Sequence, residues 1–221
     1  MLFRLVCLLA LTPALGGCLA TVSAPVSNDT SELAQLRAEN KGMILIHTSL
    51  ADGHCFEVLA KIVQPDTTGR YVDGKEVYLR RPPIKGPNGP SEIVLPAGDY
   101  GVVELVCSNL VTKRKREYYH ARVTTDGNLI TGEGTVYQQP IAKFSVLPGE
   151  FVDIGSINVS TVRAPDASGN NGEFAVTIAP IEDDWLHSLA AAKPKIYALR
   201  VQRLMTTPGR ATVSASPGAP S

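Results

Sequence analysis

The sequence predicts a mainly β protein: a sandwich of short strands with a short N-terminal helix and one or two C-terminal helices. Two observations support this fold class. Between residues 42 and 181, apolar runs of strand length alternate with clusters of glycine, proline, asparagine and aspartate. Helical spacing of apolar residues is confined to the two ends. Many short strands separated by turn signals indicate a sandwich or barrel rather than alternating βαβ units.

The length and charge of the chain narrow its class. Its 221 residues suit one domain with tails, and such a domain can bury a core unaided. Lysine and arginine together number 21, as do aspartate and glutamate, so the formal net charge is zero. Nucleic-acid binders usually carry a basic surplus, so this balance argues against a nucleic-acid partner.

The elements are expected in a simple order. Asp29-Thr30-Ser31-Glu32 has the pattern of a helix start, and this helix should end near residues 40–42. Asp73-Gly74 predicts a hairpin turn. Strands are expected at residues 43–47, 55–63, 76–79, 102–107, 118–123, 152–159 and 173–180.

Two helices are expected after the sandwich. Asp183 and Asp184 can cap a helix that runs to about residue 192, and Pro194 suits the first turn of a second one. In that second helix one face would collect Tyr197, Val201, Leu204 and Met205. The remainder, 206–221, is of low complexity and is expected to be disordered. The chain is therefore expected to have five parts. These are an N-terminal segment that is removed (1–17), a tether with the short helix (18–41), the β-sandwich (42–181), the C-terminal helices (182–205) and a disordered tail (206–221).

The N-terminus has the pattern of a secretory signal. Arg4 precedes an apolar run from residue 5 to 15, too short to cross a bilayer core that needs about 20 residues. The ending Leu15-Gly16-Gly17-Cys18 resembles the lipobox of bacterial lipoproteins. The resemblance implies cleavage between Gly17 and Cys18 and lipid on Cys18. An ordinary signal peptide that happens to contain a cysteine is the alternative.

The lipobox resemblance implies where the protein is located and that the lipid bilayer is its partner. We expect a protein of the bacterial cell envelope that is held to the lipid bilayer through acylated Cys18, at the outer membrane and facing the periplasm. Residues 19–28 are small and polar with one proline, which is typical of a flexible tether.

Four cysteines are present, and two of them remain for the exported body. Cys7 would leave with the signal, and Cys18 would carry lipid. Cys55 and Cys107 form an even pair in an oxidising compartment, so we expect a disulfide between them. Two free buried thiols are the alternative.

One internal segment carries a second resemblance. Leu95-Pro96-Ala97-Gly98-Asp99-Tyr100 enters an apolar strand and resembles the tyrosine corner of β-sandwich domains. The resemblance implies a bond from the Tyr100 hydroxyl to the backbone a few residues upstream, and an immunoglobulin-like or transthyretin-like sandwich. Segment 146–151 repeats the turn with Phe151, which has no hydroxyl.

One charge cluster favours a binding role. Lys113, Arg114, Lys115 and Arg116 are consecutive, so they can contact an anionic envelope polymer or head group. A solvated hairpin tip is the alternative.

Motifs for catalysis, metals and cofactors were not found in the sequence. The four histidines, His47, His54, His120 and His187, lack zinc-ligand spacing. Nucleophile elbows, Ser-x-x-Lys patterns, phosphate loops and dinucleotide fingerprints are missing as well. We therefore expect no cofactor and no metal. The favoured function is a membrane-anchored, non-catalytic binding or scaffold module for an envelope protein or anionic polymer; the alternative is a hydrolase that acts on an envelope polymer.

Overall fold

The structure is a computed structural model of the whole chain. It describes residues 29–50, 57–79, 89–110, 118–125, 129–131, 134–163, 173–207 and 212–217. Strands dominate, which confirms the mainly β class. In chain order the elements are α1 (Ser31–Ala38), β1 (Lys41–Leu50), β2 (Glu57–Pro65), β3 (Tyr71–Leu79), β4 (Ser91–Pro96), β5 (Gly98–Leu110), β6 (Tyr118–Thr124), β7 (Leu129–Thr131), β8 (Gly134–Tyr137), β9 (Ala142–Val146), β10 (Phe151–Arg163), β11 (Glu173–Ala179), α2 (Asp183–Ala192), α3 (Pro194–Tyr197), β12 (Val201–Gln202) and β13 (Thr212–Pro217).

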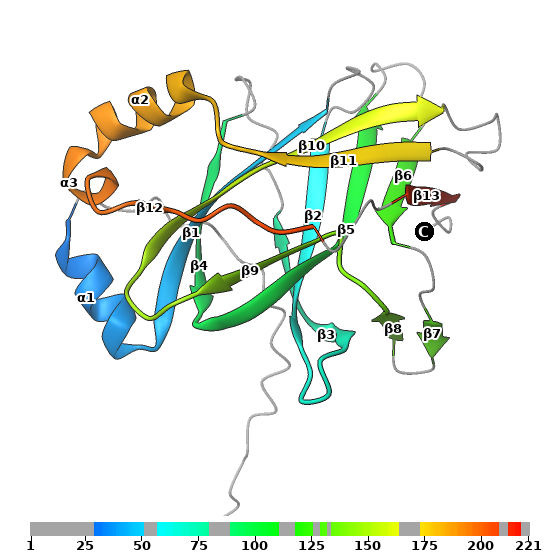
Figure 1. Cartoon of the computed structure of the whole chain (residues 1–221), viewed down its shortest axis with the longest axis horizontal. Helices are drawn as coiled ribbons and strands as arrows, with labels where there is room; N and C mark the ends of the chain where they lie inside the picture. The colour runs from blue at the N-terminus through cyan, green and yellow to red at the C-terminus, as the bar shows by residue number, and fades with distance from the viewer. Residues whose placement is uncertain are drawn as a thin grey trace, which may run out of the picture.

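The strands form one hydrogen-bonded path that turns back on itself. Its order is β4-β1-β10-β11-β13-β6-β5-β2-β3-β8-β7, with β9 paired to β5 and β12 paired to β10. The β1–β10 and β10–β12 pairs are parallel. The layer containing β4, β1 and β10 faces the layer containing β5, β2 and β9 (Figure 1), an arrangement consistent with a β-sandwich.

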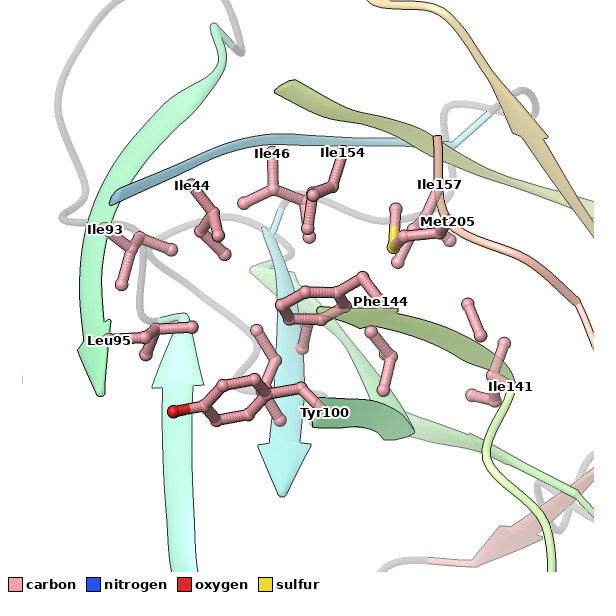
Figure 2. Close-up of a cluster of buried hydrophobic side chains, with 14 of the residues drawn as sticks. Ile44, Ile46, Ile93, Leu95, Tyr100, Ile141, Phe144, Ile154, Ile157 and Met205 are labelled. Carbon is pink, nitrogen blue, oxygen red and sulfur yellow. The ribbon is translucent and has the colours of Figure 1, made fainter. Parts of the chain in front are cut away.

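The main core lies between these two layers. Figure 2 shows Ile44, Ile46 and Ile154 pointing toward the rings of Phe144 and Tyr100. All five side chains are buried, and the two rings stack with their centroids 5.4 Å apart. Alternation along β9 explains its contribution, because every second residue from Ala142 to Val146 is buried.

A second core lies at the end of the molecule where the helices gather (Figure 1). Leu33 and Leu36 of α1 join Phe151 of β10 and Ile196 and Tyr197 of α3 in one buried cluster. The rings of Phe151 and Tyr197 meet edge to face, with centroids 5.1 Å apart. An eight-residue helix such as α1 is marginal alone, so this packing holds it in place.

The predicted second C-terminal helix is wrong beyond Tyr197. The segment 198–207, called the strap below, instead runs along β10. The amides of Arg203 and Met205 donate to the carbonyls of Asp153 (2.9 Å) and Ile154 (3.0 Å), and Thr206 exchanges backbone bonds with Lys143. These sheet bonds replace the bonds of a short and marginal helix. Of the predicted apolar face, Met205 and Tyr197 are buried, whereas Val201 is 47% and Leu204 is 37% exposed.

The predicted disorder of the tail is wrong for Thr212–Pro217. This segment forms β13, which pairs with both β11 and β6. Ladder bonds are made by backbone groups, so a run of small side chains can enter a sheet without an apolar face.

Two smaller predictions also need correction. The predicted hairpin at Asp73-Gly74 is not a turn, because β3 continues through it and pairs with β2, with an irregular register between Val63 and Pro65. Helix α2 has Glu182 at its N-cap with no side-chain cap bond, so Asp183 and Asp184 lie in its first turn. There their charges still favour the positive end of the helix dipole.

Candidate functional site

Most of the sequence-predicted site residues lie outside the described residues. These are Gly17, Cys18, Cys55 and the basic run 113–116. Cys107 is described by its backbone, which lies in β5 opposite Val58 and Ala121. The lipid attachment, the disulfide and the anionic contact therefore stay predictions.

Tyr100 makes the bond predicted for it. Its hydroxyl donates to the carbonyl of Pro96 at 2.7 Å, four residues upstream. The side chain is 2% exposed, and burial raises its pKa to about 12. Since β4 pairs with β1 and β5 pairs with β2, the bond fixes the chain where it crosses from one layer to the other.

A histidine and a serine that are far apart in sequence meet across the parallel β1–β10 pair. His47 and Ser156 are register partners, and Nδ1 of His47 lies 3.1 Å from Oγ of Ser156. The serine hydroxyl donates to Oδ1 of Asn158 at 3.0 Å. Both partners are nearly buried, and the ring of Trp185 lies 6.5 Å from that of His47. The serine hydroxyl has one proton, and this proton is directed to Asn158 rather than to the imidazole.

The strap is fixed at its start by a buried ion pair. Asp153 is completely buried, and its Oδ2 lies 2.9 Å from Nη1 of Arg200. Its other oxygen accepts from the amide of Gly155 at 2.9 Å. Burial raises the pKa of the Asp153 carboxyl, while the Gly155 amide, the Arg200 charge and the Gln202 side chain act in the opposite direction.

Further ion pairs fix the strap and the helix before it. Arg203 pairs with Glu150 and also donates to the carbonyl of Ser145 at 3.3 Å. Glu92 of β4 pairs with Lys193 and accepts from the Tyr197 hydroxyl at 2.9 Å. Burial, together with the charge of Glu92, raises the pKa of Tyr197. Lys193, Arg200 and Arg203 thus pair with carboxylates in, or directly before, strands of the sheet.

With its arginines turned toward the sheet, the strap presents apolar side chains to solvent. Leu199 is 49% exposed, Val201 47% and Leu204 37%; these three residues are the strap patch. Single exposed apolar side chains are ordinary, but three within six residues of one rigid segment form a candidate contact surface. The sequence did not indicate this surface, because Val201 and Leu204 were predicted to lie on the apolar face of a helix.

A third polar cluster lies among the strands of the opposite layer. Nζ of Lys61 donates to the Tyr137 hydroxyl at 3.1 Å, and that hydroxyl donates to Oε2 of Glu104 at 3.2 Å. All three side chains are at most 6% exposed. The tyrosine thus links two buried opposite charges, as burial of charge requires.

Comparisons with protein families, with curated proteins and with solved structures find no match for this chain. Among the described residues, the helices are too short and too polar to cross a membrane. Within the same part of the chain, histidine, cysteine, aspartate and glutamate side chains form no group of three that could hold a metal ion.

Proposed function

We propose that this protein is a non-catalytic binding module of the bacterial envelope, anchored through lipid on Cys18. Its body is a β-sandwich of the immunoglobulin-like or transthyretin-like class, and the Tyr100 bond supports that class. The single observation that carries the binding role is the strap patch, where Leu199, Val201 and Leu204 are exposed on a segment fixed by ion pairs.

The rigidity of the strap supports this role. Binding is opposed by the entropy lost when a loop becomes ordered, and a segment that is already fixed avoids most of that loss. The pairs Asp153–Arg200 and Glu150–Arg203, with the backbone bonds to β10, fix it before any partner arrives. Burying charged side chains and exposing apolar ones both cost free energy in water. The strap does both, which favours a partner that covers its apolar side chains.

Two measurements test the proposal. Radiolabelled palmitate should appear on the wild type and not on Cys18→Ser, and only the wild type should sediment with membranes. Crosslinking from membranes should then capture envelope material with the wild type and with Val162→Ser, but much less with the double variant Val201→Ser and Leu204→Ser. Val162 is 61% exposed near the far end of β10, so it is a matched control. Equal capture by the strap variant would refute the binding surface.

Two further parts of the proposal concern the pair Cys55 and Cys107 and the basic run 113–116. We propose that Cys55 and Cys107 form a disulfide, which a mass shift on reduction would detect. We also propose that Lys113, Arg114, Lys115 and Arg116 contact anionic envelope polymer. Replacing these four with serine should weaken binding to anionic liposomes at low salt, and unchanged binding would refute the contact.

A hydrolase acting on an envelope polymer is the second candidate, favoured by the 3.1 Å contact between His47 and Ser156. A serine hydrolase would react with a fluorophosphonate probe at its nucleophile, and Ser156→Ala would abolish that labelling. We expect the wild type to remain unlabelled, because the serine is 4% exposed and donates to Asn158. Labelling lost in Ser156→Ala would favour the hydrolase.

A further inference from the structure

The strap patch lies at the same end of the molecule as the start of the described chain. Helix α1, which begins two residues after Asp29, packs in the same buried cluster as Ile196 and Tyr197 of α3. The pKa of the Asp29 carboxyl is lowered by hydrogen bonds from the backbone and hydroxyl of Ser31 and also by the charge of Lys195. Asp29 therefore lies near α3, just before the strap, and Figure 1 shows α1, α3 and β12 on one side of the molecule.

The chain between Cys18 and Asp29 limits how far this end can stand from an anchoring bilayer. The two positions differ by 11 residues. A chain of that length spans at most about 40 Å. The far end of β10, where Val162 lies, is about 30–40 Å from Phe151 at the rise of a strand. The strap end is therefore held within about 40 Å of the bilayer, and it can reach the bilayer over a shorter span of chain than the Val162 end can.

We propose that the strap patch docks on the surface of the bilayer that carries Cys18, with Leu199, Val201 and Leu204 entering the boundary between head groups and acyl chains. The inference rests on the proposed lipid anchor and names the partner of the same surface.

The chemistry of the segment suits a lipid surface. Residues 193–207 include no acidic residue. Of their basic residues, Lys193, Arg200 and Arg203 pair with carboxylates in, or directly before, strands of the sheet, and Lys195 is the exposed cation. Lys195 is exposed beside the patch, where anionic head groups attract cationic side chains. Three half-exposed apolar side chains bind a bilayer weakly on their own. Attachment at Cys18 raises their local concentration at the surface, so a weak contact is enough for docking.

Photocrosslinking in native membranes tests the docking directly. Benzoylphenylalanine is placed at position 199 of the full chain and, as the matched control, at position 162. We expect a phospholipid adduct at position 199 in at least tenfold excess over position 162. A protein adduct in place of lipid at position 199, the absence of a lipid adduct there, or equal lipid adducts at both positions would overturn the proposal.

A second experiment separates docking from anchoring. The protein used is the chain from residue 18 onward with Cys18→Ser, which cannot be lipidated at that position. It keeps every described contact, because all described residues lie at or after position 29. Binding without the anchor is weak, so the vesicles of phosphatidylethanolamine and phosphatidylglycerol are used at a lipid concentration at which a measurable fraction of this chain floats. That fraction should fall about tenfold on adding Leu199→Ser with Val201→Ser, and should not change on adding Val162→Ser. Equal flotation of all three variants would overturn docking. If the wild type carried no palmitate but flotation still depended on the strap patch, the anchor would be refuted and docking would stand.

Discussion

The carboxylate of Asp153, completely buried in β10, lies 2.9 Å from the guanidinium of Arg200 in the strap. The partners are 47 residues apart in sequence. This contact fixes the strap on the sheet, so it decides which side chains of the strap reach solvent.

Replacing Arg200 with methionine should lower the free energy of unfolding by about 3 kcal/mol at pH 7, because it leaves a buried carboxylate without its partner. The loss should shrink near pH 4. Burial raises the folded-state pKa of Asp153 above 3.8, and losing the guanidinium raises it further. A carboxyl with a raised folded pKa contributes stability that is present below its unfolded pKa and is lost as pH rises through the folded value.

Urea denaturation of the Arg200→Met variant at both pH values measures this. The double variant with Asp153→Asn is the control, and it should recover part of the loss at pH 7, since no unpaired charge remains. The same loss at pH 4 and pH 7 would contradict the explanation.

Replacing Tyr100 with phenylalanine should cost about 1 kcal/mol of unfolding free energy. The hydroxyl donates to the carbonyl of Pro96 at 2.7 Å, and its removal leaves that carbonyl without this donor. The ring and its stacking on Phe144 are retained, so the change isolates the hydrogen bond. Chemical denaturation with an unchanged m-value is the measurement, and a stability equal to wild type would show that the corner bond is dispensable.

The carboxyl of Asp66 should titrate near pH 2 in an NMR pH series. Its pKa is lowered from 3.8 to about 2, first by the Thr68 hydroxyl at 2.6 Å and then by the backbone of Arg70. Its contribution to stability is present above pH 3.8 and is lost as pH falls through about 2. Thr68→Ala should move the midpoint back toward 3.8, and an unmoved midpoint would show that the hydroxyl bond is not the cause.

Gly42→Ala and Gly69→Ala should lower the free energy of unfolding for two different reasons, a steric clash in the first and an unfavourable backbone conformation in the second. A Cβ at Gly42 would lie 2.4 Å from the carbonyl oxygen of Leu147, so Gly42→Ala should destabilise by about 3 kcal/mol. Gly69 has φ +83° and nothing within 4 Å of its Cβ position, so Gly69→Ala should cost about 1 kcal/mol. Thermal unfolding compares the two. A Gly42→Ala variant as stable as Gly69→Ala would rule out the close contact.

The sequence predicted those parts of the fold that depend on near neighbours. Turn residues and apolar alternation located β1, β2, β5, β10 and β11 within a few residues. The same pattern failed at the strap, where helical spacing from Tyr197 to Met205 was outweighed by backbone bonds to β10. It failed again at β13, because small residues carry no signal of the strands that will pair with them.

The sequence by itself determined the β-rich class, the segments of β1, β2, β5, β10 and β11, and the hydrogen bond from Tyr100 to Pro96. Each depends on residues that are adjacent or a few positions apart, so local chemistry is enough. Only the tertiary structure decided the parallel pairing of β1 with β10, the contact of His47 with Ser156 and the exposure of the strap patch. Those features require segments about 50 to 110 residues apart to meet in one register, and local patterns carry no information about that register.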